Sequence, residues 1–273
     1  MTTSSMSELR RVALAVEYNG STFRGWQSQA GGGTVQDVLE QALTGIAAHP
    51  VRVQASGRTD TGVHATTQIV HFDTSARRTD SAWVRGCNAL LPPGVAVRWA
   101  CPVAAEFNAR FSARSRSYRY VLYNHPVRPA LAAGLTGWFH RPLDVAEMSR
   151  AASVLVGEHD FSAFRSSECQ AKSPVRVMHS LSLYRSGDWI TVDLCANAFL
   201  HHMVRNIVGA LVDVGCGRQP TDWLEHLLQA GDRRLASPTF SPAGLYLVGV
   251  GYDAAWGLPE DGLYKLPPVG PRE

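Results

Sequence analysis

Lysine, paired cysteines and long apolar runs are scarce or missing in this sequence of 273 residues. Only Lys172 and Lys265 are lysines, so 24 of the 26 basic residues are arginine. A guanidinium pairs bidentately with phosphate and stacks on bases, which an ammonium does not. A GC-rich coding sequence also favours arginine over lysine, so the imbalance alone assigns no function.

The five cysteines, at positions 87, 101, 169, 195 and 216, contain no Cys-x-x-Cys pair. This pattern suggests neither a zinc site nor a disulfide framework. No run approaches the roughly 20 apolar residues of a membrane span, and residues 1–11 lack the apolar core of a signal peptide. We therefore expect a soluble protein of a reducing compartment, the cytoplasm, without membrane contact.

The composition of the sequence predicts a folded core, and the order of its expected elements predicts two similar halves. Hydrophobic residues make up 45% and charged residues 18% of the chain, at a formal net charge of +3, which excludes wholesale disorder. In the first half, Thr34 and Asp37 form a capping signature before an apolar run at helical spacing. Its expected elements are a strand at 11–18, a helix from 35, strands near 51–56 and 65–72, a helix near 80–90 and a strand at 95–103.

The second half repeats the β-α-β-β-α-β order, and together the halves predict an α+β fold of two ferredoxin-like units. We expect a mixed, mostly antiparallel sheet with helices on one face, an open face free for a large ligand, and a central cleft for an active site. The halves are assigned to 11–108 and 109–254, with a disordered tail at 1–10 and a loose tail at 255–273. The expected elements of the second half are strands at 116–123, 175–185, 189–196 and 245–252, and helices at 144–157, 199–215 and 221–230.

The densest group of polar residues lies between two expected strands, at Gly57-Arg58-Thr59-Asp60-Thr61-Gly62-Val63-His64-Ala65. A tight hairpin needs only Asn-Gly or Asp-Gly at such a place. On spacing alone, Asp60 is either a turn residue that bonds its own backbone or a functional carboxylate.

A second feature is the apolar segment 199–212, which carries one permanent cation, Arg205. Burying an unpaired guanidinium is too costly to tolerate, so Arg205 either extends to solvent along its stem or pairs with a carboxylate. We favour pairing with Asp60 from the other half, which would direct the ionised carboxylate into the cleft. The adjacent His201 and His202 would point about 100° apart on a helix, a poor metal pair, so we expect no metal site.

Two further segments could contact nucleic acid. Arg114, Arg116, Tyr118 and Tyr120 share one face of a strand at period two, which suits phosphate contact and base stacking but also fits a solvated sheet face. The loop Phe23-Arg24-Gly25-Trp26-Gln27 could insert into stacked bases or fold down as a lid.

Other enzyme classes fit less well. The sequence has no Walker loop, no G-x-G-x-x-G after a strand and no H-E-x-x-H, and it lacks the G-x-S-x-G elbow of a serine hydrolase. The remaining candidate is one aspartate, Asp60, in an arginine-lined cleft without an evident metal or cofactor.

Together, these motifs resemble those of the TruA family of tRNA pseudouridine synthases. The resemblance extends in the same order over about residues 11 to 252, and no motif position departs from it. The matching segments are 57–65, Tyr18-Asn19-Gly20 through Phe23-Arg24-Gly25-Trp26-Gln27-Ser28-Gln29, Arg110 through Tyr120, Asp160 through Arg165, Phe199 through Asn206, and Gly244 through Leu247.

The resemblance implies isomerisation of uridine to pseudouridine at positions 38, 39 and 40 of the tRNA anticodon arm, by a homodimer without a cofactor. It makes Asp60 the nucleophile and Arg58 the residue that helps to extrude the target base. Tyr118 would stack on the uracil and act in proton transfer, and Arg205 would form the salt bridge that positions Asp60. The residues expected to lie against RNA are Phe23, Arg24, Trp26, Arg114, Tyr118 and His202.

Two alternative functions from other classes also use features of this sequence. A non-catalytic tRNA-binding module or chaperone could use the same scaffold, but it has little use for a carboxylate at a glycine-flanked turn, and Asp60 is intact. An unrelated hydrolase could use Asp60, but no second carboxylate stands at motif spacing for acid–base work. The isomerase hypothesis is therefore preferred, with three chemical routes open: addition to uracil C6, attack at C1′, or removal of the C2′ proton to give a glycal.

Overall fold

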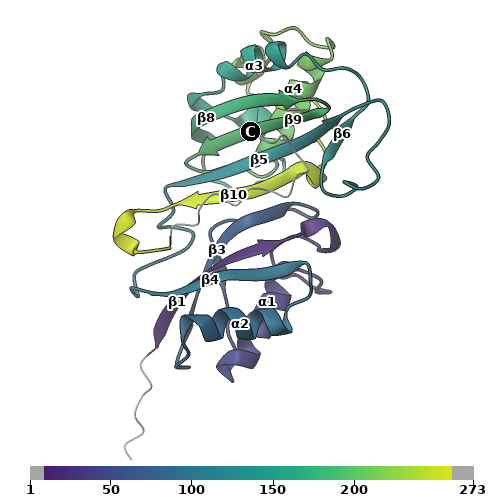
Figure 1. Ribbon diagram of the computed structural model, residues 1–273. Helices are drawn as coiled ribbons and strands as arrows, with labels where there is room; N and C mark the ends of the chain where they lie inside the picture. Colours follow the sequence, from purple (N-terminus) through teal and green to yellow (C-terminus); the bar gives the residue numbers. More distant parts are fainter. Residues whose placement is uncertain (1–8, 260–273) are drawn as a thin grey trace, which may run out of the picture.

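The computed structural model describes residues 9–259, and ten strands in this part of the chain form one open sheet (Figure 1). The sheet runs β4-β1-β3-β10-β5-β9-β8-β7, with β2 beside β3 and β6 beside β5. Its pairs are antiparallel except for β10 with β3 and β5 with β6. The predicted α+β fold with a mixed, mostly antiparallel sheet is confirmed.

The first half follows the predicted element order. Its elements are β1 (Arg10–Tyr18), α1 (Val35–Ala47), β2 (Gln54–Ala55), β3 (His64–Thr74), α2 (Asp80–Leu90) and β4 (Val95–Val103). α1 begins with the predicted capping box, in which Thr34 and Asp37 each accept a backbone N–H of the other. β2 is much shorter than the predicted strand at 51–56, because the Val53 N–H donates to the Glu40 carboxylate of α1 instead of to a strand.

The second half contains the predicted elements and two additional short strands, β6 and β7. Its elements are β5 (Ser115–Asn124), β6 (Gly137–Phe139), α3 (Val145–Ser153), β7 (Gly157–Asp160), β8 (Val175–Ser186), β9 (Trp189–Ala196), α4 (Met203–Gly215), α5 (Trp223–Ala230) and β10 (Leu245–Gly251). The helix predicted from residue 199 begins only at Met203. None of the helices in the described part has the length and apolarity that a bilayer crossing requires.

β10 joins the two halves, although it comes last in the sequence. Leu247 pairs with Ala65 of β3 on one side and with Tyr118 of β5 on the other. Tyr118 packs against the hydrophobic cores of both halves, so α1 and α2 cover the same face of the sheet as α3, α4 and α5. The largest side chains of these cores include Leu14, Leu39, Phe72 and Trp83 in the first half and Tyr120, Phe161, Phe164 and Met148 in the second.

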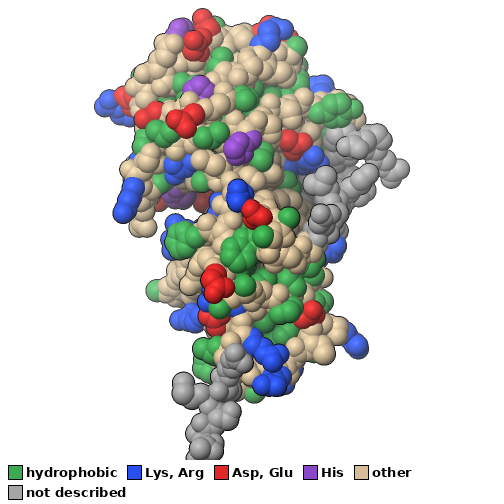
Figure 2. Space-filling view, turned by 90° about the vertical axis from the view of Figure 1, so that its left-hand side faces the viewer, with side chains coloured by type: hydrophobic (Ala, Val, Ile, Leu, Met, Phe, Trp, Pro, Cys, Tyr) green, Lys and Arg blue, Asp and Glu red, His purple; other side chains and the backbone are tan. Residues whose placement is uncertain are grey.

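The two helix groups leave the middle of this face to loops. In Figure 1, α3 and α4 lie beside the upper strands, whereas α1 and α2 lie beside the lower ones. Figure 2 shows the helix-bearing side in profile on its left, where the surface is indented between the two halves. Basic side chains lie on both edges of this indentation.

The opposite face of the sheet is covered in the first half by a small apolar cluster around Phe107. Trp256 packs into it, with its ring centroid 5.4 Å from that of Phe107. The tail predicted from residue 255 therefore has a packed beginning. Arg10 of the predicted N-terminal tail likewise opens β1, and the remainder of both predicted tails, 1–8 and 260–273, lies outside the described residues.

A buried histidine in β3 makes the stability of the fold dependent on pH. His71 is 3% exposed, and its Nδ1 accepts the Ala109 N–H at 3.1 Å. Burial, helped by the charge of Arg11, lowers the pKa of His71 to about 4. Because the unfolded chain takes up this proton near pH 6.5, the stabilising effect is complete above that pH and is lost as the pH falls towards 4.

We therefore expect His71 to lower the free energy of unfolding by about 2 kcal/mol at pH 5 relative to pH 8. His71→Asn keeps an acceptor for the Ala109 N–H but cannot be protonated, so its pH dependence should be shallower by this amount. Urea unfolding of both proteins at pH 5 and pH 8 measures the difference. Parallel pH dependences would show that His71 does not carry the effect.

Candidate active site

A buried polar network holds the loop that carries Asp60, which connects β2 to β3. The Gln68 amide donates to the Gly57 carbonyl at 2.8 Å and accepts the Ser56 hydroxyl at 2.6 Å. The Tyr18 hydroxyl shares a hydrogen bond of 2.8 Å with that of Thr59. Gln68 and Tyr18 belong to strands of the sheet. Their hydrogen bonds therefore anchor the loop to the sheet before Asp60, at Ser56 and Gly57, and at Thr59.

The segment after β1 supports the same loop from the side. The Trp26 N–H donates to the Thr59 carbonyl at 3.0 Å, and Gly25 is in a left-handed conformation with φ of 83°. Trp26 is only 2% exposed and packs against Tyr18 with a centroid distance of 5.7 Å. This burial corrects the expectation that Trp26 lies against RNA, since the side chain belongs to the core below the loop.

Gly25→Ala should distort the Asp60 loop. A Cβ at Gly25 would lie 2.9 Å from the Thr59 carbonyl oxygen and 3.2 Å from the carbonyl carbon of Asp60. We expect this contact and the positive φ to lower the free energy of unfolding by about 1–3 kcal/mol and to reduce activity. Gly57→Ala is the matched control for stability, because its Cβ would meet nothing within 4 Å. Equal thermal unfolding of the two variants would contradict the supporting role of Gly25.

Asp60 forms the predicted ion pair with Arg205 of α4. Nη1 of Arg205 lies 3.0 Å from Oδ2 of Asp60, and Nε donates to the Phe240 carbonyl at 2.8 Å. The side chains are 13% and 22% exposed, respectively, so Arg205 does not extend to solvent. The pair brings the two halves together on the helix-bearing side of the sheet, and not on the open face that was expected to be free for a large ligand.

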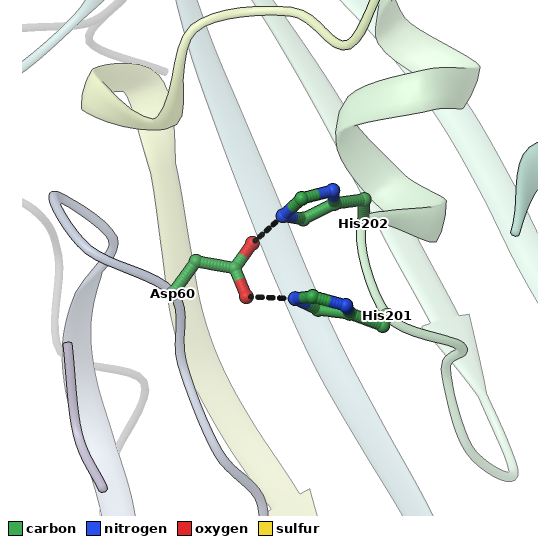
Figure 3. A group of neighbouring side chains, drawn as sticks. All are labelled: Asp60, His201 and His202. Atoms are coloured by element: carbon green, nitrogen blue, oxygen red, sulfur yellow. Dashed lines mark ion pairs between the residues drawn. The ribbon is translucent and has the colours of Figure 1, made fainter. Parts of the chain in front are cut away.

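His201 and His202 also converge on the carboxylate, contrary to the expectation that they point apart. Nε2 of His201 lies 3.3 Å from Oδ1 of Asp60, and Nε2 of His202 lies 3.4 Å from Oδ2 (Figure 3). The prediction assumed a helix, but α4 begins after His202, which has a φ of 63°. This backbone turn brings the two rings to a centroid distance of 4.0 Å, with their planes tilted by 36°.

The protonation state of His202 is set mainly by burial. Desolvation lowers its pKa below the ordinary value, and the positive charge of Arg205 acts in the same direction. The opposing attraction of Asp60 is smaller than the effect of burial. His202 is therefore neutral at neutral pH, and Arg205 is the permanent cation beside the carboxylate.

Tyr118 lies at the floor of the same site, in the row of side chains that crosses from β3 to β5. Its ring meets Phe199 edge to face at 5.0 Å. Burial raises the pKa of the Tyr118 phenol, and the negative charge of Asp60 raises it further, so the phenol stays protonated at neutral pH. Within residues 9–259 no partner for its hydroxyl is found, which leaves this group available to a substrate.

The other residues of the predicted strand face, Arg114, Arg116 and Tyr120, make contacts away from the Asp60 carboxylate. Arg114 is exposed and pairs with Asp253 at 2.6 Å, and Tyr120 is fully buried. Arg116 donates to four carbonyl groups, which ties the Asp60 loop to two other segments; its acceptors are Ser56, Arg110, Ala113 and Asn197. Of the four residues on the predicted strand face, only Tyr118 lies at the Asp60 site.

Arg58 and the loop after β1 lie around the site. Arg58 is exposed beside Asp60 and makes no hydrogen bond or ion pair with the described residues. Arg24 is also exposed, and Phe23 is half-buried. A pocket of about 570 Å³ adjoins the site through His202; it is lined by Ser162, Arg165, Ser166, Ser167, His202, Arg233, Arg234 and Thr239.

Sequence reasoning missed His201 as a partner of Asp60, and it missed the supporting roles of Gln68 and Arg116. The signal for His201 was present, since it lies in the same matched segment as Arg205. No local signal marks the contacts of Gln68 with Gly57 or of Arg116 with Ser56 and Asn197, because these partners lie 11 to 81 residues away in the sequence.

Comparisons with known proteins give one consistent result. The family model described as tRNA pseudouridine synthase matches residues 14–112 and 151–253. The chain is 58% identical to tRNA pseudouridine synthase A of Methylobacillus flagellatus over 91% of this chain and 95% of that protein. It is 58% identical to the protein of the same name from Dechloromonas aromatica, over 93% and 100%, and 60% identical to that of Aromatoleum aromaticum, over 92% and 96%. The chain therefore belongs to the tRNA pseudouridine synthase family.

Proposed function

We propose that this chain isomerises uridine to pseudouridine at positions 38, 39 and 40 of the tRNA anticodon stem-loop, with Asp60 as the nucleophile. The observation that carries the proposal is the Asp60 carboxylate, held by Arg205 from the other half of the chain at 3.0 Å. A pure binding module would have no use for a carboxylate so positioned in a basic cleft.

The reaction breaks the N1–C1′ bond of uridine, rotates the uracil and joins C5 to C1′. The proton on C5 is lost and N1 gains one, so the reaction is a redox-neutral isomerisation. Asp60 serves by adding to C6, by attacking C1′, or by taking the C2′ proton. Each route requires an ionised carboxylate shielded from water, because water could trap the separated ring.

Tyr118 supports this chemistry from the floor of the site. Its ring offers a stacking surface for the flipped uracil, and its protonated, unpaired hydroxyl is suited to proton exchange near C5. The phenol lies close enough to Asp60 for the carboxylate to affect its pKa. Both groups can therefore act on one base.

The uridine must leave its helix before it can reach Asp60, which costs a few kcal/mol of unstacking. Arg58, exposed and unpaired within the described residues, is the residue best placed to occupy the vacated space. Phe23 and Arg24 border the same site, and the pocket with Arg165, Arg233 and Arg234 offers contacts for the RNA backbone. Arg114 and His202 complete the proposed RNA surface, and binding should weaken as salt rises.

The proposed assembly is a homodimer in the cytoplasm that uses no cofactor. Its five cysteines are all free, which is common in a reducing compartment. Light scattering after gel filtration should give twice the monomer mass of 29.7 kDa. A monomer mass at the concentrations used for catalysis would reject the dimer.

Mapping of pseudouridine in an unmodified tRNA transcript tests the proposed function. Carbodiimide labelling and primer extension should detect product at positions 38, 39 and 40 and at no other uridine. The control transcript carries cytidine at these three positions and should remain unlabelled. Bound but unmodified tRNA would favour the binding-module alternative, and released base or cleaved RNA would favour a hydrolase.

A further inference from the structure

Three potential metal ligands meet at the proposed active site. They belong to Asp60, His201 and His202, each of which offers one ligand atom, and these three atoms all lie within 4.8 Å of one another. Among residues 9–259, this is the one group of three or more His, Cys, Asp or Glu side chains whose ligand atoms converge in this way. The side chains are 22%, 34% and 25% exposed, so an ion can reach them from solvent.

The distances fit a shared ion better than direct hydrogen bonds. The two Asp60–histidine contacts measure 3.3 and 3.4 Å, whereas charge-assisted hydrogen bonds measure about 2.7–2.9 Å. In a tetrahedral zinc site with metal–ligand bonds of about 2.0–2.1 Å, neighbouring ligand atoms lie roughly 3.3 Å apart. Two imidazole nitrogens and one carboxylate oxygen are also a common ligand set for zinc.

We propose that Asp60, His201 and His202 form a binding site for Zn²⁺ or a similar divalent transition metal, and that the bound ion inhibits the enzyme. The inhibition rests on the proposed function, since the metal would occupy the lone pairs through which Asp60 acts on uridine. Removal of the metal frees the Asp60 carboxylate to act on uridine again.

Arg205 sets the character of this site. Its guanidinium contacts Oδ2 of Asp60, the oxygen that also faces His202, so a bound ion remains close to a permanent positive charge. Neither His201 nor His202 donates from Nδ1 to another described residue, so the support that usually orients metal-bound histidines is missing. The site is therefore reversible, and it fills only when free metal is available.

Titration of the full chain with Co²⁺ tests binding without relying on catalysis. We expect visible ligand-field absorption of four- or five-coordinate Co²⁺ at one equivalent, and its loss on addition of Zn²⁺. His201→Asn and His202→Asn should each weaken Co²⁺ binding at least ~10-fold. Asn is chosen because it tolerates the positive φ at position 202. The control is His179→Asn, an exposed residue of β8, which should bind as wild type does.

The metal-site proposal would be wrong if Co²⁺ produced no visible absorption, or if wild type and His202→Asn bound Co²⁺ equally well. The inhibition is tested separately by tritium release from tRNA labelled at uracil C5, which Zn²⁺ should suppress and EDTA restore in both wild type and His179→Asn. Full activity at a Zn²⁺ concentration that displaces Co²⁺ would overturn the inhibition. If the chain lacks synthase activity altogether, the proposed function fails, while the Co²⁺ titration still decides the metal site.

Discussion

Asp60→Asn should lower the rate of pseudouridine formation by on the order of 10⁴-fold or more, with tRNA binding within a few-fold of wild type. Asn has nearly the same shape as Asp, and its amide oxygen can still accept a hydrogen bond from the Arg205 guanidinium, which lies 3.0 Å from Oδ2 of Asp60. The substitution therefore removes the charge and nucleophilicity of the carboxylate and leaves the fold intact.

Single-turnover kinetics and filter binding with the same tRNA transcript separate these two effects. Thermal unfolding of Asp60→Asn is the control, because a misfolded variant would also be inactive. If the folded variant retained normal turnover, Asp60 would have no part in the mechanism. Weak binding together with low turnover would instead show that the residue serves mainly to hold RNA.

Arg205→Met should lower the single-turnover rate by on the order of 10²–10³-fold, the usual effect of removing one electrostatic partner from an active site. Methionine fills much of the same apolar space, but it loses both the contact with Asp60 and the hydrogen bond to the Phe240 carbonyl. The carboxylate, which is 22% exposed beside Arg205 in the wild type, then lacks its permanent cation. We expect a smaller effect on tRNA binding than on the rate.

Two further variants control this experiment. Arg205→Lys keeps the charge but not the forked geometry, so its rate should fall between those of wild type and Arg205→Met. Arg218→Met removes an exposed ion pair with Asp213 and should leave the rate unchanged. A rate for Arg205→Met within about threefold of wild type would show that the ion pair does not position Asp60.

Local sequence signals were sufficient for most of the fold. The Thr34–Asp37 capping box and the apolar spacing after it predict α1, and the two neighbouring strands expected at 175–185 and 189–196 correspond to the β8–β9 hairpin. These signals act over a few residues, so they can be read without knowing the tertiary structure. The short strand β2 was over-predicted because Glu40, which takes its backbone partner, lies on another element.

The candidate site was predictable in its central pair and not in its surroundings. Asp60 and Arg205 were matched because a buried cation requires a carboxylate, a constraint that sequence alone expresses. The convergence of His201 and His202 depends on the left-handed backbone at residue 202, for which histidine gives no signal. The burial of Trp26 under the Asp60 loop could not be read from a segment that is rich in loop-forming residues.

The central claim is that Asp60 of this chain isomerises uridine in tRNA. The most direct measurement is the release of tritium to water from an unmodified tRNA transcript labelled at uracil C5, with protein freed of metal by EDTA. We predict release by wild type and none by Asp60→Asn at equal tRNA binding. Release by both proteins, or by neither while tRNA remains bound, would contradict the claim.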